Sequence, residues 1–63
     1  MKKHEAIKRA KELSRKNNYD YFVVNEPDEG KSNYQPVRED QLDTWFYGCL
    51  VYACVEPNGQ VHE

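Results

Sequence analysis

Residues 43–59, DTWFYGCLVYACVEPNG, decide the fold of this 63-residue chain. Their central part, Trp45 to Val55, contains eleven residues without a charge, although 32% of the whole chain is charged. As a single strand, residues 45–55 would be about twice the usual length of five or six residues. We favour a division of this run at Gly48 into a short helix and a strand.

The spacing of Leu42, Trp45 and Phe46 is helical and predicts a short second helix near residues 39–47, with acidic residues in its first turn. Gly48 then stands where a helix C-cap is expected. The following strand covers residues 49–56, and because it is apolar on both faces we expect it inside the sheet. The aromatic and β-branched residues at 44–47 favour the alternative, one long strand with a bulge at Gly48.

Towards the N-terminus, apolar residues recur at intervals of three and four and predict an amphipathic helix over residues 3–17. The residues of this stripe are Ala6, Ile7, Ala10, Leu13 and Ser14. Asn17 and Asn18 end the helix, because asparagine tolerates the left-handed conformation of a helix cap. Since the stripe is thin, we expect the helix to cover a sheet.

Between the two helices the sequence predicts a hairpin. Residues 19–25, YDYFVVN, are β-branched and aromatic and predict a strand, and EPDEGKSN supplies turn residues. Residues 33–37, NYQPV, predict a short return strand at the sheet edge, because Pro36 has no N–H to donate. After the central strand, EPNG predicts a turn and QVHE a strand stub.

The whole chain, residues 1–63, is therefore expected to form a single small α+β domain. The N-terminal amphipathic helix packs on a small, mainly antiparallel sheet of three to four strands. A domain of this size buries only about 60% of the surface of its unfolded chain, so additional support is expected.

Cysteines and metals are not the expected source of that support. Cys49 and Cys54 would lie about 16 Å apart on a strand, too far for a disulfide. The basic N-terminus leads into no apolar signal segment, so we expect reduced thiols and a cytoplasmic location. His4 and His62 lie at opposite ends without metal-ligand spacing, and neither a metal nor a cofactor is predicted. Self-association, most simply as a homodimer, is the remaining source.

A membrane location is not expected. The apolar run of eleven residues is shorter than the about 20 residues that a transmembrane helix requires. Ile7 and Leu13 are too few large apolar residues to anchor the first helix on a membrane surface.

Positive and negative charges are distributed unevenly. Residues 1–18 carry seven Lys or Arg against two Glu, a net +5, and residues 19–63 carry two against nine acidic residues, a net −7. A basic amphipathic helix is typical of binding to nucleic acid or acidic partners. Alternatively these cations only solvate the outer helix face, and the overall pI of about 5.6 disfavours a dedicated nucleic-acid binder. The basic-surface candidates are Lys8, Arg9, Lys11, Arg15 and Lys16.

The aromatic residues are the second feature of interest. Alternation along a strand places Tyr19 and Tyr21 on one face, and Tyr52 on the face of Leu50 and Cys54. If one sheet face is uncovered, its tyrosines form a protein interface, where Tyr and Trp are enriched. The alternative is that these rings complete a small core. The interface candidates are Tyr19, Tyr21, Tyr52 and Trp45.

We do not expect an enzyme, because both cysteines lie in an apolar strand, where a thiol behaves as a small hydrophobe. The predicted function is that of a small cytoplasmic interaction protein: an inhibitor, adaptor or accessory subunit that binds an unidentified protein and self-associates. Its acidic residues would engage a basic partner. These residues are Asp28, Glu29, Glu39, Asp40 and Asp43. The alternative is a nucleic-acid-associated module that uses the basic N-terminal helix.

Overall fold

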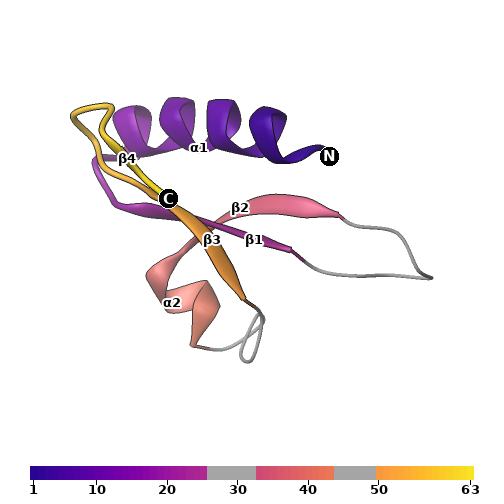
Figure 1. Cartoon of the computed structure of the whole chain (residues 1–63). Helices are drawn as coiled ribbons and strands as arrows, with labels where there is room; N and C mark the ends of the chain where they lie inside the picture. Colours follow the sequence, from indigo (N-terminus) through magenta and orange to yellow (C-terminus); the bar gives the residue numbers. More distant parts are fainter. Residues whose placement is uncertain (26–32, 44–49) are drawn as a thin grey trace.

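The computed structural model describes residues 1–25, 33–43 and 50–63. These residues form two helices and a four-stranded antiparallel sheet of order β2-β1-β3-β4 (Figure 1). The elements are α1 (Lys3–Asn17), β1 (Tyr21–Asn25), β2 (Tyr34–Arg38), α2 (Glu39–Leu42), β3 (Val51–Val55) and β4 (Val61–His62). The predicted α+β class, with an N-terminal helix packed on the sheet, is confirmed.

Helix α1 spans the predicted residues. Asn18 follows it in the left-handed conformation, with φ 58° and ψ 42°, and its N–H donates to the Ser14 carbonyl at 2.8 Å. This conformation ends the helix and satisfies one of its last carbonyl groups. The asparagine stop expected from the sequence is therefore confirmed at Asn18.

The core lies between α1 and one face of the sheet. The helix contributes the fully buried Ala6 and Ala10, and the sheet contributes Tyr21, Val23, Ala53 and Val55. Because alanine side chains are small, the helix backbone approaches the sheet closely. Each fully buried valine contributes about 1.5–3 kcal/mol relative to an exposed one, so the sheet supplies most of the core's apolar stabilisation.

Strand β3 lies between β1 and β4, the internal position expected for a strand that is apolar on both faces. Its register with β1 shifts, because Val23 pairs with Ala53 but Val24 pairs with Val51. Tyr52 therefore has no partner in β1.

The shift turns the side chain of Tyr52 towards α1. Its ring lies 5.5 Å from that of Tyr34, edge to face, and 5.9 Å from Lys3 Nζ. Cys54 instead pairs with Phe22 on the opposite face. The predicted common face for Tyr52 and Cys54 is wrong, because a bulge breaks the alternation along the strand.

Strand β2 forms a sheet edge, as the sequence predicts. The backbone nitrogens of Tyr34, Pro36 and Arg38 are directed away from β1. The N–H of Tyr34 donates to the Met1 carbonyl at 3.0 Å, and that of Arg38 to Gln41 Oε1 at 2.9 Å. Proline has no N–H. The edge thus presents no free amide donor to a further strand.

Helix α2 begins at Glu39, as predicted, and lies on the other side of the sheet from α1 (Figure 1). Residues 44–49 lie outside the described residues. They include Trp45 and the rest of the predicted second helix. They also include Gly48, where the sequence left open a division into helix and strand or one long strand with a bulge.

The EPNG turn is confirmed: Gly59 has φ 91° and donates its N–H to the Glu56 carbonyl at 2.9 Å. Neither helix of the described chain has the length and apolarity needed to cross a membrane.

Candidate functional site

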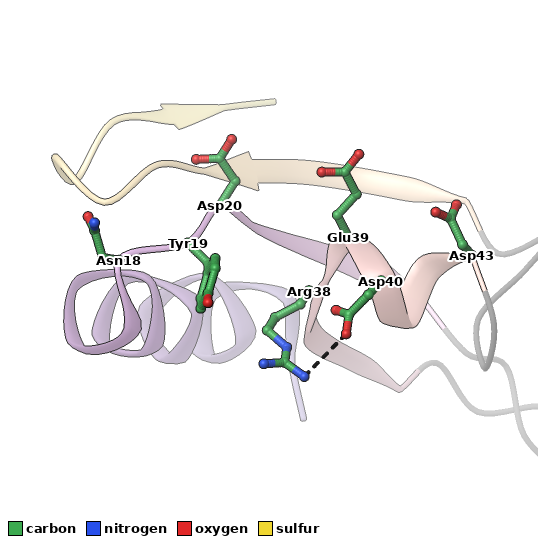
Figure 2. Close-up of a pocket in the computed structure, with 7 residues that line it drawn as sticks. All are labelled: Asn18, Tyr19, Asp20, Arg38, Glu39, Asp40 and Asp43. Carbon is green, nitrogen blue, oxygen red and sulfur yellow. Dashed lines mark hydrogen bonds and ion pairs between the residues drawn. The ribbon is translucent and has the colours of Figure 1, made fainter.

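An open cleft of about 630 Å³ lies between the segment after α1 and helix α2, and we call it the acidic cleft (Figure 2). Its lining residues are Asn18, Tyr19, Asp20, Arg38, Glu39, Asp40 and Asp43. Four of the seven are carboxylates, and they come from two separate parts of the chain: Asp20 follows α1, and the other three lie in α2 or at its C-cap.

Strand pairing places these carboxylates side by side. Tyr21 pairs with Arg38 at one end of the β1–β2 ladder. Asp20 directly precedes the first of these residues, and Glu39 directly follows the second. The two side chains therefore project from the same end of the sheet, as Figure 2 shows.

The cleft carries a formal charge of −3, from four carboxylates and one arginine. Arg38 Nη2 lies 3.3 Å from Asp40 Oδ2, and this ion pair is exposed. Exposed pairs of this kind contribute only about 0–1 kcal/mol, so the arginine is readily displaced. Asp20, Glu39 and Asp43 are exposed and make no ion pair with any described residue.

The carboxylates surround the cleft and do not converge on one point. Across the described ranges, no three His, Cys, Asp or Glu side chains come close enough together to hold a metal ion. Dispersed carboxylates next to an aromatic ring suit a row of cationic side chains, because Tyr19 adds a ring face to which a cation is attracted.

The four aromatic candidates lie in different environments. Tyr19 is 58% exposed and lines the acidic cleft. Tyr21 is 5% exposed and is a core residue rather than a surface candidate, because its strand face is covered by α1; its hydroxyl accepts a hydrogen bond from Asn17 at 2.9 Å. Tyr52 is half-buried beside Tyr34. Trp45 falls outside the described residues.

The five basic candidates are all exposed on α1 but lie on two sides of it. Successive residues of a helix are rotated by about 100°, so residues 4, 8, 11 and 15 form one line. We call Lys8, Lys11 and Arg15, with His4 at the N-terminal end, the basic stripe. Arg9 and Lys16 lie on the other side, and Arg9 pairs with Glu12 at 3.1 Å.

Cys54 is a free, half-buried thiol. Burial, followed by the negative charges of Asp20 and Glu56, raises its pKa, so the thiol is neutral at neutral pH. His62 Nε2 lies 2.6 Å from Glu56 Oε2. Because a neutral thiol is a weak nucleophile, Cys54 is not activated for nucleophilic attack.

Three of the five acidic candidates, Glu39, Asp40 and Asp43, lie together in the cleft. Asp28 and Glu29 fall outside the described residues. Asp20 was not predicted as a site residue, because in the sequence it lies within the strand predicted over residues 19–25; the observed strand begins one residue later, at Tyr21. Its role follows from the pairing of Tyr21 with Arg38, for which the sequence contains no local indication.

No protein-family model, curated protein sequence or solved structure matches this chain. Its function is therefore inferred from the geometry of its own residues.

Proposed function

We propose that the chain is a small, non-enzymatic interaction protein that binds a basic segment of another protein in the acidic cleft. It would act as an inhibitor, adaptor or accessory subunit. The observation that carries this proposal is the arrangement of four carboxylates, from two separate parts of the chain, around one open cleft that also exposes Tyr19.

The chemistry of the cleft favours arginine or lysine side chains. Carboxylates accept charge-assisted hydrogen bonds from a guanidinium group, and an exposed cation–π contact with Tyr19 adds about 0.5–1 kcal/mol. The volume of about 630 Å³ suits side chains. Because the cleft is open, an extended peptide can lie across it.

Action by binding rather than catalysis has two further supports among the described residues. The thiol of Cys54 is held in its neutral form. The hydroxyl of Ser14 is buried and hydrogen-bonded to the carbonyl groups of Tyr19 and Val55. Both groups have structural environments that do not favour nucleophilic attack.

Self-association and a cytoplasmic location belong to the same proposal. Leu50 and Val51, next to and at the start of β3, are 69% and 49% exposed, which leaves apolar surface available to a second copy. Because the outer edge of β2 presents no free amide donor, it is an unfavourable place for a strand of a second copy to pair. The cytoplasmic location is supported by the free thiol of Cys54. Light scattering across a dilution series tests self-association.

A labelled arginine-rich peptide tests the cleft, by fluorescence anisotropy at low salt. The double variant Glu39→Gln/Asp43→Asn removes two cleft carboxylates and should weaken binding by about two- to thirtyfold, at about 0.2–1 kcal/mol for each exposed charge pair. The matched control, Glu5→Gln/Glu12→Gln, removes the same charge from α1.

The control variant should bind the peptide as the unmodified chain does. Equal weakening in both double variants would show that net charge alone attracts the peptide and would refute the cleft. Undetectable binding of the peptide by the unmodified chain would also refute it.

A further inference from the structure

We propose that the basic stripe of α1 is a surface for the phosphate backbone of nucleic acid, separate from the acidic cleft. It consists of Lys8, Lys11 and Arg15, with His4 at the N-terminal end. All four side chains are exposed.

The positive charge of the stripe is available to a ligand. Lys8, Lys11 and Arg15 make no ion pair with any described residue, whereas Arg9, on the other side of the helix, is paired with Glu12. Helical periodicity places Lys16 one turn after Glu12, on that same mixed side. The basic helix therefore has one line of unneutralised cations and one side of mixed charge.

The dimensions of the stripe fit a phosphate backbone. From Lys8 to Arg15 the helix rises about 10.5 Å, at about 1.5 Å per residue. Phosphates follow one another at about 3.4 Å along the axis of one DNA strand, so this length spans about three of them. A helix holds its cations at fixed spacing, which suits a regular polyanion.

A second element adjoins the C-terminal end of the stripe. Lys11 and Arg15 line a cleft of about 400 Å³ together with the β3–β4 turn at residues 57–59. Glu12 also lines it, and its carboxylate is held by Arg9. The two cations therefore lie on the wall of a recess rather than on a flat helix surface.

The acidic character of the chain does not oppose this surface at physiological salt. The carboxylates of α2 lie across the sheet from the outward face of α1 (Figure 1). Charges farther apart than about 8 Å are largely screened at that ionic strength. The two charged surfaces can therefore act independently, and loss of one leaves the other intact.

The test is titration of a short fluorescein-labelled DNA single strand, and of its duplex, with the full chain. Neutralisation of three phosphates predicts that affinity falls between 50 and 200 mM salt by about 20-fold for the single strand and about 40-fold for the duplex. The variant Lys11→Ala/Arg15→Ala should weaken binding at low salt and reduce this salt-dependent loss to about threefold, because one contact remains.

The matched control is Lys2→Ala/Lys16→Ala, which also removes two exposed positive charges, lies outside the stripe and keeps Arg9 as the partner of Glu12. It should retain the affinity and salt dependence of the unmodified chain. Both variants keep the helix, since alanine has the highest helix propensity.

Three outcomes would overturn the proposal. The first is undetectable DNA binding at low salt, and the second is equal weakening in the two double variants. The third is binding of poly-glutamate as tightly as DNA, which would identify the stripe as a surface for acidic proteins. Because these variants leave the acidic cleft unchanged, their result is independent of the arginine-rich peptide experiment.

Discussion

The backbone N–H of Tyr34 donates a hydrogen bond to the carbonyl oxygen of Met1, 3.0 Å away. The N-terminal ammonium group in turn donates to Asn33 Oδ1 at 2.6 Å. The segment before α1 is thereby attached to the outer edge of β2. With Pro36 and the bond from Arg38 to Gln41, this attachment closes the edge against a further strand.

Replacement of Pro36 by valine should open that edge. Pro36→Val adds an outward N–H at a position where none exists, and we expect the mass measured by light scattering to rise with concentration. Gln35→Val is the control, because it places valine on the same strand at a residue whose amide is directed towards β1. Equal masses for Pro36→Val and the unmodified chain would contradict the closed-edge explanation.

Ser14→Ala should destabilise the fold. The side chain of Ser14 is fully buried and is within hydrogen-bonding distance of the carbonyl oxygens of Tyr19 and Val55, the latter at 3.4 Å. Removal of a buried donor leaves its acceptors unsatisfied and costs about 1–3 kcal/mol. Urea unfolding measures this change. Lys16→Ala, an exposed change on the same helix, should stay within about 0.5 kcal/mol, and a Ser14→Ala effect equally small would refute this role.

The left-handed conformation of Asn18 predicts that its replacement by alanine and by glycine will affect stability differently. Asn18→Ala should cost about 1–2 kcal/mol, because a Cβ disfavours the left-handed conformation, whereas Asn18→Gly should be neutral or stabilising. In a domain of this size, 1 kcal/mol corresponds to a Tm shift of about 4–8 °C.

Asn17 provides the comparison for the cap, because it is still helical and its amide donates to the Tyr21 hydroxyl. Asn17→Gly should therefore lower the Tm. A lower Tm for Asn18→Gly as well would show that the cap conformation is not what stabilises this helix end.

The thiol of Cys54 should react slowly. In a Cys49→Ser variant, which leaves Cys54 as the one thiol, the midpoint of the pH dependence of alkylation should lie above that of a free cysteine. The reason is that burial and the nearby carboxylates of Asp20 and Glu56 raise the pKa of Cys54 above its usual range.

The raised pKa has a consequence for stability. Above the pKa of the unfolded thiol, the unfolded chain ionises while the folded thiol stays protonated, so the free energy of unfolding falls with rising pH. Cys54→Ser should remove this alkaline loss, as measured by urea unfolding at several pH values. An alkylation midpoint equal to that of free cysteine would contradict both expectations.

Local patterns in the sequence determined the elements. The 3.6-residue period and the asparagines after it defined α1, because amphipathic burial and capping depend on residues three to four positions apart. The two strands of the first hairpin and the EPNG turn follow from β-branched residues, proline and glycine, and the observed strands begin within two residues of the predicted starts. The acidic start of α2 is a local property of the same kind.

Tertiary structure decided the relationships between elements. Pairing of Tyr21 with Arg38 joined Asp20 to the acidic residues of α2, and packing on the sheet buried Tyr21 while leaving the basic stripe exposed. The bulge opposite Val23 moved Tyr52 to the side of α1, against the alternation predicted along its strand. Register and bulges depend on how several strands pack together, and that energy is distributed over contacts distant in sequence, so no short stretch specifies them.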